Sequence, residues 1–257
     1  ASGHTGDAHS ITVNVVKGGI DGSITNTGIA GNDPNFVSDG QTYYYTTIGG
    51  TDWLRRNISD SSCGVAYFNC EAASDVFGRY YSYSEAKQIC TELPADGGNA
   101  WRLPTDKDWV TLVKNITGDA KGEFSAEEHK EIYWDNKING KPSLAARLMA
   151  DGYFNKEQLW TYWPEVGTPV NTSEMAIIPV GYANLGVTPD VPLKSNYPAA
   201  LFEGTYEYAA FWTADEVESN TDQAYYRYIF TKTPHLMIGK GYKETYGASV
   251  RCVRESD

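Results

Sequence analysis

One stretch decides how the middle of this chain folds: Trp101-Arg102-Leu103-Pro104-Thr105-Asp106-Lys107-Asp108-Trp109. Pro104 cannot continue a strand ladder and holds the residue before it extended, so one element ends here. Thr105 is predicted to be a helix N-cap, because its hydroxyl can accept the free backbone N–H of Asp108. Apolar side chains then repeat at helical spacing, at Trp109, Leu112, Val113 and Ile116. The stretch therefore predicts a short amphipathic helix that begins after Thr105.

This stretch also resembles a known family. Trp-Arg-Leu-Pro-Thr followed four residues later by Trp is similar to the signature of bacterial C-type-lectin-like folds, most closely the Fibrobacter succinogenes major paralogous domain of secreted Bacteroidetes proteins. The other motifs of that family follow in order at Trp53–Ile58, Tyr81–Ala86 with Cys90, Ala176–Tyr182, Phe211–Thr213 and Gly247–Val253. The resemblance covers roughly residues 50 to 255. It implies an α+β fold in which short helices pack on a twisted, mostly antiparallel β-sheet.

The chain is expected to have two regions. Residues 1–50 lie outside the resemblance and are predicted to form an N-terminal β extension or a tether, whereas residues 51–257 form the C-type-lectin-like domain. Within the first region, residues 11–16 alternate as a strand would, residues 18–40 are rich in Gly, Asn, Asp and Thr, and residues 43–48 suggest a second strand. Besides the helix after Thr105, we expect helices over residues 82–91, 125–134 and 141–150.

Composition excludes some classes of partner. The 257 residues carry a net charge of −12, which argues against nucleic acid and anionic membranes, because phosphate binding needs clustered Lys and Arg. No apolar run of about 18 residues is present to span a bilayer. The first residue is Ala1 rather than Met, which fits an exported chain whose signal has been removed. We therefore expect an extracellular or cell-surface protein, with any lipid anchor located upstream of residue 1.

Cysteine usage agrees with export. The four cysteines, at 63, 70, 90 and 252, form no CxxC pair of the kind found in zinc ribbons, and they allow three connectivities. A bridge between Cys63 and Cys70 would close a small local loop. The family resemblance implies the other bridge, between Cys90 and Cys252, which ties the first helix of such folds to the last strand.

Candidate binding residues come from the aromatic-rich C-terminal part. Tyr and Trp give rigid contact area with a polar tip, and Arg adds directional hydrogen bonds. In the strand around Arg227 the two-residue period puts Tyr225, Arg227 and Ile229 on one face, with Tyr226, Tyr228 and Phe230 on the other. Arg227 is costly to bury without a partner, so its face is predicted to be the open one. The candidate ligand-binding residues are Trp212, Asp215, Glu216, Tyr225, Arg227, His235, Lys240, Tyr242 and Tyr246.

Metal and enzyme chemistry find little support. The acidic run at residues 215–222 fails the EF-hand pattern, since Thr221 stands where Gly is needed and Arg227 where Glu is needed, and it is expected to be a solvated loop. The chain also lacks the triplets of calcium-dependent sugar-binding lectins. The fold resemblance extends to formylglycine-generating oxidases, but we expect all four cysteines to be in bridges. No hydrolase, metalloprotease or P-loop motif occurs. No cofactor, metal or enzymatic activity is predicted.

The expected function is recognition of an extracellular protein or glycan, as in an adhesin. Related variable proteins that are diversified by retroelements use the C-terminal part of this fold as their binding face, and residues 212–246 resemble such a region. The alternative is a structural or adhesive subunit of a surface assembly such as a fimbria, with residues 1–50 in docking. An unpaired strand in residues 1–50 would favour assembly, whereas a segment packed onto the domain would favour a self-contained binder.

Overall fold

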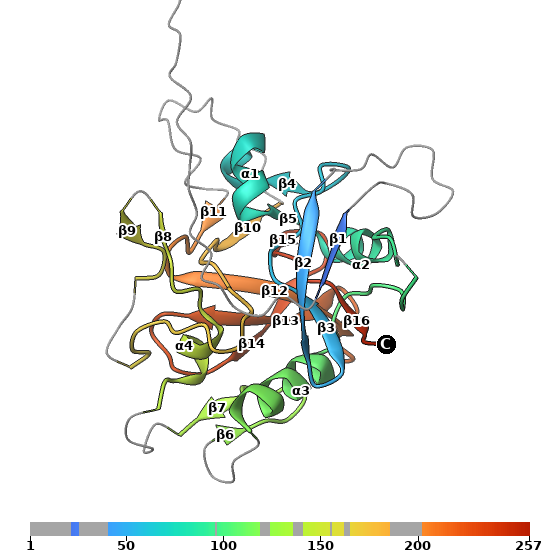
Figure 1. Ribbon diagram of the computed structural model, residues 1–257. Coiled ribbons are helices and arrows are strands. Elements are labelled where there is room, and N and C mark those ends of the chain that lie inside the picture. Colours follow the sequence, from blue (N-terminus) through green and yellow to red (C-terminus); the bar gives the residue numbers. More distant parts are fainter. Residues whose placement is uncertain are drawn as a thin grey trace, which may run out of the picture.

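The computed structural model describes residues 22–25, 41–95, 97–118, 124–135, 141–154, 156–161, 165–185 and 202–257. They form a mixed α+β structure with few helices and several antiparallel sheets (Figure 1). The helices are α1 (Glu71–Phe77), α2 (Tyr83–Thr91), α3 (Asp106–Thr117) and α4 (Leu144–Leu148), with a 3-10 turn at Tyr67–Asn69. None of the helices in this part of the chain has the length and apolarity needed to span a bilayer.

Two sheets organise the molecule. The first has the order β1 (Gly22–Thr25), β2 (Thr42–Ile48), β3 (Thr51–Leu54) and β16 (Val253–Glu255), so the last strand pairs with an early one. The central sheet has the order β12 (Tyr208–Glu216), β13 (Gln223–Phe230) and β14 (Met237–Tyr242). In Figure 1, α3 lies below the central sheet, and β10 and β11 lie above it.

The remaining strands form smaller antiparallel units. A three-stranded sheet has the order β11 (Phe202–Glu203), β10 (Tyr182–Asn184) and β15 (Tyr246–Gly247). Three strand pairs join β4 (Val65–Ala66) to β5 (Arg79–Tyr80), β6 (Phe124–Ser125) to β7 (Tyr133–Trp134), and β8 (Tyr153–Phe154) to β9 (Glu157–Gln158).

The helix starts follow from local sequence. Thr105 Oγ1 accepts the backbone N–H of Asp108 at 3.2 Å, which confirms the predicted N-cap. The Asp108 carboxylate in turn accepts the backbone N–H of Thr105 at 2.6 Å and completes a capping box. Helix α2 is capped in the same way by Ser82 and Glu85. The helix predicted over residues 141–150 is shorter, because α4 begins after the N-cap Ser143 and Pro142 precedes it.

The helix predicted over residues 125–134 is wrong. These residues run from β6 to β7, and His129 has a left-handed φ of 57° that no helix continues. Ile132 and Trp134 are buried while Glu131 and Tyr133 are exposed, which is the two-residue period of extended chain. The local capping pattern at Ser125 is overridden because burying Ile132 and Trp134 in the main core removes far more apolar surface from water than a surface helix would.

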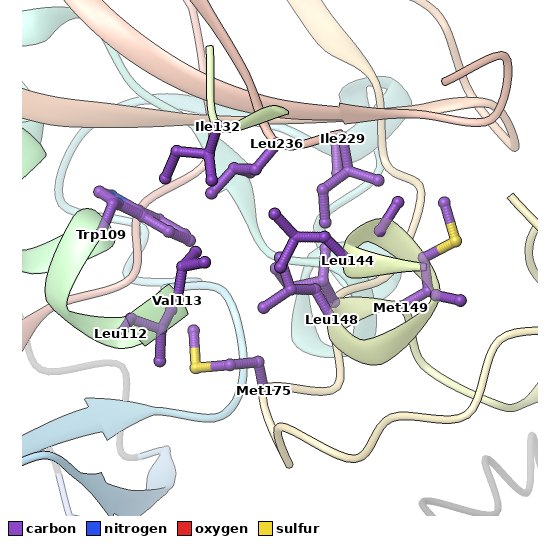
Figure 2. Close-up of a cluster of buried hydrophobic side chains, with 14 of the residues drawn as sticks. Trp109, Leu112, Val113, Ile132, Leu144, Leu148, Met149, Met175, Ile229 and Leu236 are labelled. Atoms are coloured by element: carbon purple, nitrogen blue, oxygen red, sulfur yellow. The ribbon is translucent and has the colours of Figure 1, made fainter. Parts of the chain in front are cut away.

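The main core lies between the central sheet and the two helices beneath it. In Figure 2, Trp109, Leu112 and Val113 of α3 point toward Leu144 and Leu148 of α4, with side chains of the central sheet and the β6–β7 segment above them. Trp53 of β3 meets Trp109 edge to face at 5.0 Å between ring centroids, which connects this core to the first sheet. The helical repeat after Thr105 thus faces the core, as the sequence predicts.

One of the two expected disulfides is present. Cys90 of α2 is bonded to Cys252 just before β16, with both residues fully buried. Cys63 and Cys70 are instead free thiols, so the predicted local bridge is wrong. Strand β4 and the 3-10 turn separate them: Cys63 packs against the cluster around α2, whereas Cys70 is exposed at the start of α1. Burial and the Glu85 carboxylate raise the pKa of Cys63 to about 12.

The N-terminal region is described in part. Strand β2 confirms the strand expected at residues 43–48, and it pairs with both β1 and β3. Tyr43 of β2 is fully buried, so this part of residues 1–50 is packed onto the rest of the chain. The strand expected over residues 11–16 lies outside the described residues.

Candidate recognition surface

The two faces of the central sheet have opposite characters. Antiparallel pairing places Phe211, Arg227 and Ile238 side by side across the sheet, and the next row holds Trp212, Tyr226 and Gly239. Because side chains alternate along a strand, Tyr225, Arg227 and Ile229 share one face of β13 while Tyr226, Tyr228 and Phe230 share the other, as predicted. The face that carries Arg227 was predicted to be the open one, however, and this is wrong: Arg227 and Ile229 are buried, whereas Tyr226 and Tyr228 on the other face are partly exposed.

Arg227 is fully buried rather than exposed. Its Nε donates to Oδ1 of Asp106 at 2.6 Å and its Nη2 to Oδ2 at 2.8 Å, and both side chains have no exposed surface. Its Nη1 donates to the backbone carbonyl of Lys130 at 2.7 Å. Arg227 therefore has the partner that makes its burial tolerable, and its face of the sheet covers the core.

The opposite face carries a cluster of tyrosines, which we call the tyrosine cluster. Its five rings form a closed circuit of neighbouring contacts: 5.4 Å from Tyr182 to Tyr208, 4.7 Å on to Tyr228, 5.7 Å to Tyr226, 4.5 Å to Tyr246 and 5.2 Å back to Tyr182. The rings come from β10, β12, β13 and β15, and each residue is partly exposed. Four strands thus share one aromatic surface.

Glycines in β14 make room for these rings. A Cβ atom on Gly239 would lie 2.3 Å from Cζ of Tyr226, and one on Gly241 would lie 2.8 Å from both Trp212 and Tyr246. Any side chain at either position would displace an aromatic ring, so the spacing of the two glycines is matched to the cluster. Trp212 lies beneath the tyrosine cluster, where it is fully buried and contacts the rings of Tyr226 and Tyr246 edge to face.

Four phenols of the cluster have raised pKa values. Burial and a hydrogen bond to the Glu203 carboxylate raise the pKa of Tyr182 to about 12. Burial and the neighbouring Tyr226 raise the pKa of Tyr208 and of Tyr228, and burial with Tyr208 raises that of Tyr246. Tyr182, Tyr208 and Tyr228 therefore keep uncharged hydroxyl groups at neutral pH, which can donate and accept hydrogen bonds. The hydroxyl of Tyr246 is also uncharged, and its oxygen is buried.

Several predicted residues lie close together near the start of β13, on the face of the sheet that carries Arg227. The ring of Tyr225 stacks on His129 at 4.5 Å, and Lys240 Nζ lies over the same ring at 5.5 Å. His129 Nε2 is 3.4 Å from Oδ1 of Asp215, whose Oδ2 accepts the backbone N–H of Asp106 at 2.7 Å. Tyr225, Asp215 and Lys240 are thus brought together, joined by His129, which the sequence did not single out.

The other predicted residues are dispersed. Glu216 is exposed and pairs with Lys243 at 2.8 Å, and Tyr242 is 57 % exposed at the end of β14. His235 stacks on Tyr133 at 4.2 Å and accepts the backbone N–H of Trp134 through Nδ1 at 2.9 Å. Burial lowers the pKa of His235. Of the nine predicted residues, only Tyr246 belongs to the tyrosine cluster, with Trp212 directly beneath it.

The sequence placed Tyr226 and Tyr228 on the correct face of β13 but predicted that this face was the buried one, and it did not connect Tyr182 or Tyr208 with them. One signal was available: the tyrosines at alternate positions in β13 face a strand that reads Gly239-Lys240-Gly241, where one side carries no side chains. Among the described residues, no group of three or more His, Cys, Asp or Glu side chains is arranged to hold a metal ion.

Comparison with known proteins gives one match. The family model described as the Fibrobacter succinogenes major domain matches residues 46–254. Neither the search of curated proteins nor the search of solved structures found a significant match.

Proposed function

This chain belongs to the Fibrobacter succinogenes major domain family, and from this premise we propose that it is a secreted or surface-displayed protein that binds an extracellular protein or glycan through the tyrosine cluster. The fold proposed is the C-type-lectin-like one, in residues 51–257, with residues 1–50 as an N-terminal β extension. Antiparallel sheets and the bridge from the first long helix, α2, to the last strand support it.

The closed circuit of five partly exposed tyrosines carries the proposal. Tyrosine supplies a large contact area with a polar tip and few rotatable bonds, which is why it is enriched in binding surfaces. These rings are held by stacking on one another and by Trp212 beneath them, so little side-chain entropy remains to be lost on binding. An apolar surface of this kind, assembled from four strands, is typical of a recognition site.

Export and a binding role are supported by different features. A fully buried disulfide is typical of proteins that fold in oxidising compartments. An oxidase-like use of the cysteines is disfavoured, because Cys252 is bonded to Cys90 and the raised pKa of Cys63 keeps its thiol protonated. The pairing of β1 and β2 onto β3 favours a self-contained binder over an assembly subunit.

A screen against glycan arrays and arrays of extracellular proteins tests the proposal. We expect binding by the wild type to be lost in a Tyr182→Ala, Tyr228→Ala double variant. The matched control is Tyr153→Ala, which removes a tyrosine that is 59 % exposed outside the cluster and should leave binding unchanged. A wild type that binds nothing, or a double variant that binds as well as the control, would refute the proposed function.

A further inference from the structure

Strand β14 is an edge of the central sheet. In the sheet order β12-β13-β14 it pairs with β13 on one side, and among the described residues no other named strand pairs with it. Within the described ranges, the backbone contact on the outer side is at Leu236, the residue just before β14. There, Ile132 and Leu236 exchange backbone hydrogen bonds, at 2.9 Å from Ile132 N to Leu236 O and at 3.2 Å from Leu236 N to Ile132 O.

Two independent observations show which backbone groups face outward. Because the N–H and C=O of Leu236 point away from β13, the two-residue period points those of Ile238 and Lys240 the same way. The Tyr225 carbonyl accepts a hydrogen bond from Thr213 Oγ1 of β12, so its neighbour Tyr226 faces β14, where it is paired with Gly239. Both observations therefore indicate that the backbone N–H and C=O groups of Ile238 and Lys240 point away from β13, toward the outer side of β14.

These outward groups are unoccupied in the part of the chain that the structure describes. No backbone or side-chain group there is hydrogen-bonded to the outward N–H or C=O of Ile238 or Lys240. The ammonium of Lys240 forms no ion pair with a described residue and lies over the ring of Tyr225, along the sheet face rather than across the edge. Lys240 is thus an exposed cation that does not block the edge with its side chain.

The tyrosine cluster extends to this same edge. The ring of Tyr226 reaches over Gly239, and neither Gly239 nor Gly241 places a side chain between the cluster and the outer side of β14. A strand added beside β14 would therefore bring every second side chain against Tyr226 and the others toward Lys240 and Tyr225.

We propose that the outer edge of β14 binds an extended polypeptide strand of a partner protein, with an acidic side chain facing Lys240. This rests on the proposed function and names its partner class, since the added strand would use the tyrosine cluster as one wall. Edge strands usually carry protection against pairing. Here Ile132 already shows that the edge accepts an antiparallel backbone, and it stops short of Ile238 and Lys240. Strand addition supplies affinity through backbone hydrogen bonds and specificity through alternate side chains.

The test is selection of a displayed library of random linear peptides on the wild-type protein. Selected peptides are synthesised with and without N-methylation of alternate backbone amides. We expect enriched peptides with an acidic residue, whose affinity falls about ten-fold or more on N-methylation because hydrogen bonds are lost. We expect Lys240→Pro, which removes an outward N–H at an edge position, to abolish binding, and Lys240→Ala to weaken it.

Hydrogen exchange gives a readout that does not depend on the proline variant. Peptide addition should slow exchange at the amides of Ile238 and Lys240 in the wild type. No enriched peptide, equal affinity after N-methylation, or unprotected amides would overturn the inference. If Lys240→Pro still binds an array ligand that the Tyr182→Ala, Tyr228→Ala variant loses, the proposed function stands and the strand inference fails. If only the proline variant loses peptide binding, the edge is correct and the tyrosine cluster is not the site.

Discussion

Arg227 and Asp106, which are 121 residues apart, form a bidentate ion pair in which neither side chain has exposed surface. The pair joins the middle of β13 to the first turn of α3. Asp106 also accepts the backbone N–H of His129 at 2.6 Å, so a single carboxylate fixes the central sheet, the helix start and the segment that crosses over Arg227.

We expect removal of one partner of this pair to be severely destabilising. Arg227→Met leaves the Asp106 carboxylate buried without its cation, which should lower the free energy of unfolding by about 3–5 kcal/mol. The double change Asp106→Leu, Arg227→Met removes both charges and should cost less than either single change. Urea unfolding of the three variants measures this, and a double variant that is less stable than both single ones would contradict it.

The glycine at position 239 should be required by the ring of Tyr226. Gly239→Ala places a Cβ atom 2.3 Å from that ring, and we expect it to lower the free energy of unfolding by about 1–3 kcal/mol. In a Tyr226→Ala background the ring is absent, so the same glycine substitution should cost little. The double-mutant cycle measures the difference directly. Equal costs in the two backgrounds would show that Gly239 serves another purpose.

The two free cysteines should react at very different rates. Cys70 is exposed, whereas the pKa of Cys63 is raised to about 12, so little Cys63 thiolate exists near pH 8. A colorimetric thiol reagent should therefore modify one equivalent rapidly, and mass spectrometry should assign it to Cys70. Glu85→Gln removes a negative charge that raises the pKa of Cys63, so it should accelerate the slow phase. Rapid modification of two thiols in the wild type would be inconsistent with this structure.

Stability should decline in alkali because of the tyrosine cluster. Free tyrosine has a pKa of 10.0, while Tyr182 is raised to about 12 and Tyr208 and Tyr246 are also raised. Below pH 10 these phenols are protonated in both the folded and the unfolded chain, and their stabilising contribution is complete. Above it the unfolded chain releases protons that the folded chain keeps, so the free energy of unfolding should fall as the pH rises from 10 through the folded pKa values. Urea unfolding across this range, with absorbance of the phenolate, measures the effect. A Tyr208→Phe variant should show a smaller decline.

Short sequence patterns correctly predicted the features that depend on neighbouring residues. The N-cap at Thr105, the helix over residues 82–91, the strand at residues 43–48 and the bridge from Cys90 to Cys252 were all recoverable from residue spacing or family resemblance. Which face of the central sheet covers the main core was not, because period-two alternation gives two faces without saying which one meets a buried carboxylate. The buried face is the one that carries Arg227, because Arg227 pairs with Asp106. Asp106 lies in a different element, and its place at a helix start is explained equally well by its favourable interaction with the helix dipole.

The other errors also arose because local sequence patterns do not specify contacts between residues that are distant in the chain. The capping pattern at Ser125 was sound as local chemistry but lost to the burial of Ile132 and Trp134 in the core. The proximity of Cys63 and Cys70 in sequence gave no information on where each thiol points. The tyrosine cluster needed the pairing of β10 with β15 as well as that of the neighbouring strands β12 and β13. The pairing of β10 with β15, which are distant in sequence, is not encoded in either strand alone.

The sulfur bridge between Cys90 and Cys252 also has a mechanical consequence. The bridge spans 162 positions of sequence, and β10 through β15, with all five tyrosines, lie inside that span. Tension applied to the chain on either side of the bridge would pass directly from one sulfur to the other and bypass the enclosed strands. A protease that cuts once between residues 91 and 251 would leave both pieces joined. Shear and single cleavages would thus leave the tyrosine surface attached to the rest of the molecule.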